Sequence, residues 1–110
     1  MIVEECWSDA AGLNRMKGHV APGYVHHTPF GDRDFAGFRQ GLEWVESRIG
    51  NRVYRAEHIV VEGGLAAAFI AWRGTSAADG SPVEGRGAYH CRIGADGLVH
   101  EDWDVFFPAG

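Results

Sequence analysis

The spacing of the apolar residues changes once along this chain, near Gly50, and this change constrains the fold more than any other feature. Up to Gly50, apolar side chains recur at intervals of three and four residues, the spacing of one face of a helix. Beyond Asn51 they alternate with polar side chains in runs rich in β-branched residues, which is the pattern of strands. The sequence therefore predicts an α+β fold with helices packed on one side of a mainly antiparallel sheet.

Turn and cap residues divide the two halves into elements. We expect helices from residue 2 to a stop near Gly12, over 13–20, and over 35–49 with Asp32 or Asp34 as the cap, and a short extended piece over 24–28. Strands are expected over 52–61, over 65–73, in a stretch ending at residue 93, and over 99–107. The strand over 65–73 is mostly apolar, so we expect it to be covered on both faces. These elements fit one domain spanning residues 1–110.

Charge and hydropathy argue against two classes of partner. The 15 acidic residues outnumber the 10 basic ones, and no basic run is present, which disfavours nucleic acid. The apolar stretch 65–72 is far shorter than the roughly 20 residues that span a bilayer, which disfavours a membrane. The N-terminal sequence has no signal-peptide pattern, and Cys6 and Cys91 have no C-x-x-C spacing. We therefore expect reduced thiols and a cytoplasmic location.

The segment VHEDWDVFF near the C-terminus presents two different faces when it is read as a strand. One face carries His100, Asp102, Asp104 and Phe106, and the other carries Val99, Glu101, Trp103, Val105 and Phe107. The alternation alone leaves open whether the acidic row lies in water or lines a pocket. In a dry pocket the two carboxylates, about 7 Å apart, would repel each other, and one would favour its protonated form, which suits proton transfer.

Neighbouring polar side chains are the next candidates for chemistry. His26 and His27 face opposite ways on an extended segment, so at most one enters a cavity, and strand parity favours His26. Tyr89 shares a face with Cys91 and Ile93 and would donate a hydrogen bond to a substrate oxygen if that face is internal. The histidine spacing supports no metal site.

Aromatic residues suggest both a pocket and an interface. We expect the substrate-binding residues to be Tyr24, Thr28, Phe38, Trp44, Phe69 and Phe106. Trp44 lies off the apolar stripe of its helix, so it faces either a cavity mouth or a partner. Trp72 and Trp103 are expected on outward faces of the sheet, where they would form an apolar patch. This patch predicts a homodimer that pairs through the sheet.

The order of the elements and four local sequences resemble the nuclear-transport-factor-2-like superfamily, in its SnoaL-like branch of polyketide-cyclase relatives. The segments that carry the resemblance are APGYVHHTP (21–29), FAGF (35–38), WRGT (72–75) and DGLVHEDWDVF (96–106). The resemblance implies a cone-shaped α+β barrel, in which three N-terminal helices pack on a curved, mainly antiparallel sheet around a cavity.

The resemblance also implies roles for individual residues. The acidic residue after the Trp of the last strand is the general acid/base of the cyclases, and here that position is Asp104. The recurrent His of the family matches His27, and Tyr89 stands where relatives use Asp or His. Two positions depart from the family: Asp102 replaces a common His, and Thr28 replaces an Asp or Asn.

Two functions stay open on these grounds. The first is cofactor-independent acid/base catalysis, such as cyclisation, isomerisation or dehydration, on an apolar cyclic or polyketide-like substrate. Asp104 would move the proton, with Asp102, Tyr89 and His26 or His27 as polar helpers. The alternative is a non-catalytic ligand-binding or dimerisation module of the same fold.

Overall fold

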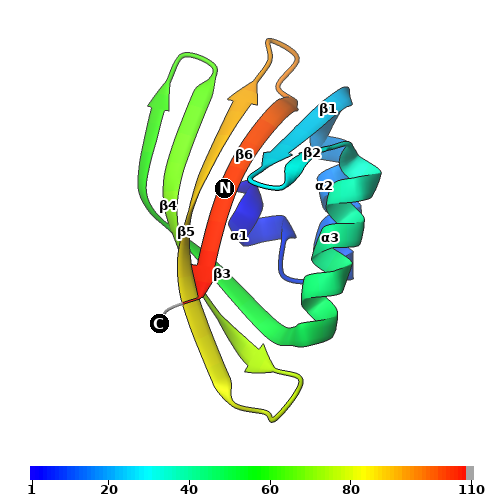
Figure 1. Cartoon of the computed structure of the whole chain (residues 1–110). Helices are drawn as coiled ribbons and strands as arrows, with labels where there is room; N and C mark the ends of the chain where they lie inside the picture. The colour runs from blue at the N-terminus through cyan, green and yellow to red at the C-terminus, as the bar shows by residue number, and fades with distance from the viewer. Residues whose placement is uncertain (109–110) are drawn as a thin grey trace.

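The computed structural model describes residues 1–108 as helices packed against one curved sheet (Figure 1). The helices are α1 (Ile2–Cys6), α2 (Ala10–Met16), the 3₁₀ helix η1 (Lys17–His19) and α3 (Phe35–Arg48). The strands are β1 (Val20–Thr28), β2 (Gly31–Arg33), β3 (Ile49–Glu62), β4 (Leu65–Ser76), β5 (Pro82–Ile93) and β6 (Val99–Pro108). This arrangement confirms the predicted α+β fold with three α-helices in the N-terminal half.

The sheet has the strand order β2-β1-β6-β5-β4-β3. Within residues 1–108, the β1–β6 pair is parallel, and the other neighbouring strands pair antiparallel. β2 and β3 are edge strands that pair on one side only, so the sheet is an open, curved surface and not a closed barrel (Figure 1). The expected cone is therefore corrected to an open sheet, because the chain places no strand pairing between β2 and β3.

Helix α3 follows its sequence signals closely. The Asp34 side chain accepts a hydrogen bond from the Gly37 amide at 2.8 Å, which caps the helix and decides between the two candidate caps. Phe38 is the buried residue of the helix, and α3 ends at Arg48, directly before β3. The helix thereby becomes a wall facing the sheet.

The N-terminal helices differ from the expectation. α1 ends at Cys6, and α2 begins after Asp9 and continues through Gly12, which was expected to stop a helix. Gly12 is needed for close packing, because a Cβ atom there would lie 2.4 Å from the Cys6 carbonyl oxygen. The chain is already extended at Val20, where β1 begins, so the second helix is shorter than predicted.

The helices cover only one face of the sheet. Ala66, Ala68 and Ile70 of β4 are buried on that face, whereas Leu65 and Phe69 are 44% and 43% exposed on the other. The expectation that this strand is covered on both faces is therefore wrong. Trp72 packs against the core, so its predicted outward position is wrong as well. No helix in residues 1–108 is long and apolar enough to cross a membrane.

Candidate functional site

The carboxylate of Asp102, on β6, lies at the centre of a buried polar cluster. Asp102 is 0% exposed and accepts hydrogen bonds from three side chains. The Tyr24 hydroxyl lies 2.8 Å from both carboxylate oxygens, and the Tyr89 hydroxyl lies 2.9 Å from Oδ2. His26 Nδ1 lies 2.5 Å from Oδ1. A buried carboxylate needs such partners, so the cluster fixes the position of the Asp102 side chain.

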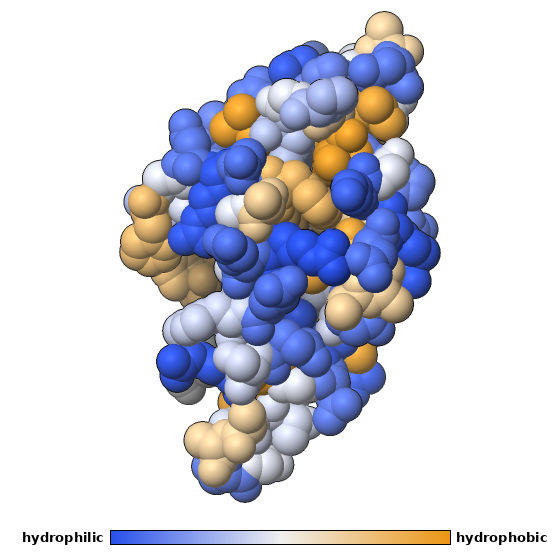
Figure 2. All heavy atoms as spheres, turned by 90° about the vertical axis from the view of Figure 1, so that its right-hand side faces the viewer, coloured by the Kyte–Doolittle hydropathy of each residue, from blue (hydrophilic) through white to orange (hydrophobic). Residues whose placement is uncertain are grey.

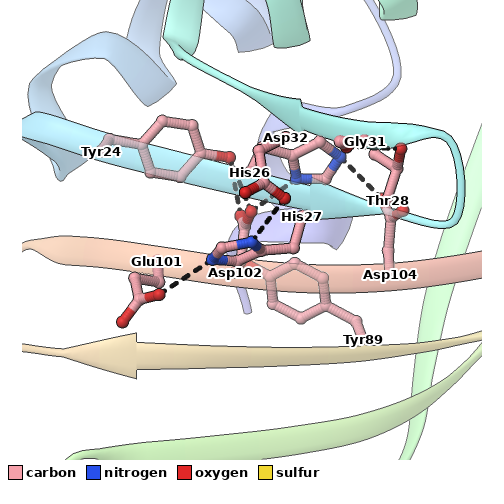
Figure 3. A network of polar contacts seen from close by, with 10 residues as sticks. All are labelled: Tyr24, His26, His27, Thr28, Gly31, Asp32, Tyr89, Glu101, Asp102 and Asp104. Atoms are coloured by element: carbon pink, nitrogen blue, oxygen red, sulfur yellow. Dashed lines mark hydrogen bonds and ion pairs between the residues drawn. The ribbon is translucent and has the colours of Figure 1, made fainter.

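His26 lies between the two carboxylates that the sequence had placed side by side (Figure 3). The parallel register of β1 and β6 sets His26 opposite Asp102, and its Nε2 then lies 3.3 Å from Asp104 Oδ2. The side chain of Asp102 is 0% exposed, and that of Asp104 is 15% exposed. The result is a chain of three groups, Asp102–His26–Asp104, of which the last reaches accessible space.

The electrostatics of this chain favour a charged imidazole. Burial on its own would lower the pKa of His26, but the hydrogen bonds to Asp102 and Asp104 and the charges of both carboxylates raise it to about 9. At neutral pH both ring nitrogens therefore carry protons and donate. Burial, with the Asp102 charge adding to it, raises the pKa of Tyr24 and Tyr89, so both hydroxyls remain donors.

A cavity of about 1000 Å³ separates α3 and the β1–β2 turn from the inner face of the sheet. Its wall is mostly apolar and includes Trp7, Phe38, Leu42, Trp44, Trp72 and Phe106. His26 and Asp104 are part of the same wall. Seen from the side that carries α3, the surface mixes hydrophobic and hydrophilic side chains (Figure 2). Trp44 is 59% exposed and lies at the cavity edge, which agrees with one of its two predicted positions.

The structure places His27 on the opposite face of the sheet from His26. Its Nδ1 lies 2.8 Å from Asp32 Oδ1, and its Nε2 lies 2.8 Å from Glu101 Oε2. Its ring stacks on that of Trp103, with the ring centroids 4.9 Å apart. His27 is not among the residues that line the α3–sheet cavity. Strand parity, which favoured His26 as the inward residue, was therefore the correct guide.

The other predicted site residues separate into three groups. Phe38, Trp44 and Phe106 line the cavity, and so does Thr28, whose hydroxyl also donates to the Gly31 carbonyl within the β1–β2 turn. Tyr24 and Tyr89 lie behind the wall and contact Asp102 instead. Phe69 lies on the outer face, because it alternates with the buried Ala68 and Ile70, and it does not contribute to this cavity.

Two cavity residues, Arg52 and Tyr54 on β3, were missed by the sequence reasoning. Arg52 is 3% exposed and donates from Nε to the Tyr54 hydroxyl at 3.0 Å. An arginine in a strand is usually solvated, so its residue type pointed away from the cavity. The available signal was the strand periodicity, which places Arg52 on the same face of β3 as Tyr54 and Ala56. Within residues 1–108, no group of three or more His, Cys, Asp or Glu side chains is arranged to hold a metal ion.

Comparison with solved structures shows the same fold in several bacterial proteins. The candidate polyketide cyclase IdmH from Streptomyces antibioticus is 21% identical, with 94% of this chain and 86% of that chain covered and a TM-score of 0.84. A candidate SnoaL-like polyketide cyclase from Jannaschia sp. CCS1 is 13% identical, with coverages of 94% and 77% and a TM-score of 0.81. AclR, a candidate hydroxylase from Streptomyces galilaeus, is 22% identical, with coverages of 92% and 68% and a TM-score of 0.77.

The sequence comparisons give a second, independent result. No curated protein sequence matches the chain significantly. The profile of the SnoaL-like domain matches residues 4–102, which include β1, α3 and the first part of β6. The match thus spans His26 and Asp102, and it covers nearly the whole chain. The chain belongs to the SnoaL-like domain family.

Proposed function

We propose that this protein binds an apolar cyclic or polyketide-like molecule in the α3–sheet cavity and catalyses proton transfer on it without a cofactor. The observation that carries the proposal is the position of Asp104 and His26, an acid/base pair in the wall of a mostly apolar cavity. Burying a charged pair among apolar side chains costs free energy unless the pair has further partners. Asp102 is such a partner, bound to His26. The similar folds of the candidate polyketide cyclases support this substrate class.

Asp104 is the group in this proposal that exchanges a proton with the substrate. Its carboxylate accepts a proton from a carbon atom next to a carbonyl group, and the enolate that forms then closes a ring, shifts a double bond or expels a leaving group. The imidazolium of His26 holds Asp104 in place through Nε2 and balances its charge. Asp102 holds His26 through Nδ1 and does not touch the substrate, so it is a positioning residue.

The test is the exchange of hydrogen for deuterium at the carbon next to the carbonyl group of 1-tetralone in D₂O, followed by NMR. We expect the wild-type protein to accelerate this exchange and Asp104→Asn to lower the acceleration by roughly 10²- to 10⁴-fold. Asp32→Asn is the matched control, because Asp32 contacts His27 on the other side of the sheet and is not part of the cavity wall. Binding of 1-tetralone with exchange at the background rate would instead support a non-catalytic ligand-binding module.

A further inference from the structure

A second polar cluster lines the same cavity, with residues from β3, from β4 and from the end of α1. It consists of Arg52, Tyr54, Trp7 and Trp72, all of which line the cavity. The antiparallel register pairs Tyr54 with Trp72, and the rings of Trp7 and Tyr54 lie 6.0 Å apart. All four side chains carry hydrogen-bond donors.

Arg52 is held entirely by the protein. Its Nε donates to the Tyr54 hydroxyl at 3.0 Å, and its Nη2 donates to the Trp7 carbonyl at 3.0 Å. Its Nη1 donates to the Ile49 carbonyl at 2.8 Å and to the Glu46 carboxylate. These contacts use four of the five N–H donors of the guanidinium group. Arg52 is therefore a fixed positive charge that orients Tyr54.

The hydroxyl group of Tyr54 keeps an unused donor hydrogen in this arrangement. Because its hydroxyl oxygen accepts from Arg52, its own O–H points elsewhere, and within residues 1–108 no side chain or backbone oxygen accepts it. Burial raises the pKa of Tyr54, and the charge and hydrogen bond of Arg52 oppose this only in part, so the phenol stays protonated at neutral pH. The residue is 9% exposed and lines the cavity.

Two further donors in the same wall have no partner. The indole Nε1 atoms of Trp7 and Trp72 are buried, and the described part of the chain offers no acceptor to either. Buried polar groups are normally paired, so each of these donors costs free energy in the folded chain. Trp7 is also in contact with the proposed catalytic region, since its ring lies 6.4 Å from that of His26.

We propose that Tyr54, oriented by Arg52, donates a hydrogen bond to a carbonyl oxygen of the bound ligand. This inference rests on the proposed function, because Tyr54 would assist the proton removal that is proposed for Asp104. A donor aimed at the carbonyl oxygen stabilises the negative charge that develops there when a neighbouring carbon loses its proton. The ligand class is thereby restricted to ketones and quinones with acceptor oxygens, and amines are disfavoured.

The experiment is infrared spectroscopy of 1-tetralone labelled with ¹³C at the carbonyl carbon, bound to the full chain. In the wild-type protein we expect the carbonyl band at a lower frequency than in cyclohexane, since a hydrogen bond weakens the C=O bond. Tyr54→Phe should move the band most of the way back. Ser81→Ala is the control, because it removes a hydroxyl that contacts Asp79 and is not part of the cavity wall, so the band should stay in place.

Affinity gives a second measurement that is independent of turnover. Tyr54→Phe should weaken the binding of 1-tetralone by roughly tenfold and leave unchanged the binding of tetralin, which lacks the carbonyl group. Equal losses for both compounds, no binding of either, or a wild-type band at the cyclohexane position would overturn the proposal. The band position in Asp104→Asn separates this inference from the proposed function: a lowered frequency without hydrogen exchange supports the Tyr54 contact and contradicts only the catalytic role. Should Tyr54→Phe not fold, the wild-type band still decides.

Discussion

His26 is the residue whose ionisation links the site to the stability of the whole chain. Its ring is held at both nitrogens by carboxylates, and its side chain is 7% exposed. An imidazole in an unfolded chain has an ordinary pKa near 6.5, whereas His26 in the folded protein has a pKa of about 9. The folded state therefore binds one proton that the unfolded state releases between these two values.

We expect the free energy of unfolding to fall as the pH rises from about 6.5 to 9, by an amount on the order of 3 kcal/mol attributable to His26. Below this window both states hold the proton, so this contribution is complete and constant. Urea unfolding across the pH range measures the slope. His27 titrates in the same direction, but its partner Asp32 is exposed and its partner Glu101 is part-exposed, so its contribution is smaller. His26→Gln should flatten most of the slope, whereas His19→Gln, at an exposed position, should leave it intact.

For individual residues, the sequence predicted the row of polar side chains on β6 but not the contacts that join them through His26. The alternation in β6 placed Asp102 and Asp104 on one face, and the structure puts that face toward the helices. The sequence did not predict that the His26 imidazole lies between Asp102 and Asp104, because His26 is 76 residues away from Asp102 in the chain. The contact depends on the parallel register of β1 and β6, for which no local sequence signal exists.

Among the elements, those whose ends carry a local hydrogen-bonding signal were the most predictable. Asp34 caps α3 through its own side chain, and a cap of this kind is readable from the sequence. The boundary between α1 and α2 was not readable, because Gly12 was interpreted as a stop. Its actual role is to let the backbone of α2 approach the Cys6 carbonyl, a contact that depends on tertiary packing.

The packing of α1 on α2 gives a prediction for this glycine. Gly12→Ala should lower the free energy of unfolding by about 1–3 kcal/mol, because its Cβ would lie 2.4 Å from a backbone oxygen that cannot rotate away. Gly18→Ala is the control in the neighbouring helix η1, where a Cβ meets nothing within 4 Å. We expect the control to stay within about 0.5 kcal/mol of the wild type in chemical denaturation. A Gly12→Ala protein as stable as the control would contradict the close approach of the two helices.

For the molecule as a whole, the uncovered face of the sheet is the feature that needs an explanation. Phe69 and Val105 are 43% and 38% exposed there, and with Trp103 and Val60 they line a shallow groove of about 740 Å³. Exposed apolar surface of this kind usually marks an interface. The structure corrects the residues expected to form it, since Trp72 is on the inner face and only Trp103 is on the outer one.

We predict that two copies of the chain associate through this face. Light scattering should give the mass of a dimer for the wild type and that of a monomer for Phe69→Asp, since a buried charge in an apolar interface is strongly unfavourable. Phe30→Asp is the control, because Phe30 is 92% exposed in the β1–β2 turn and not part of the groove. A wild-type mass that stays monomeric at every concentration would contradict the prediction.

The parallel contact between β1 and β6 has a further consequence for how the site can be assembled. Residues 77–80, between β4 and β5, are exposed and form the tip of a loop. A cut there divides the chain into a fragment that carries His26, Arg52 and Tyr54 and a fragment that carries Asp102 and Asp104. Neither fragment alone contains both His26 and Asp104. The proposed site therefore forms only when the two fragments associate. Proton-transfer activity would then report that association.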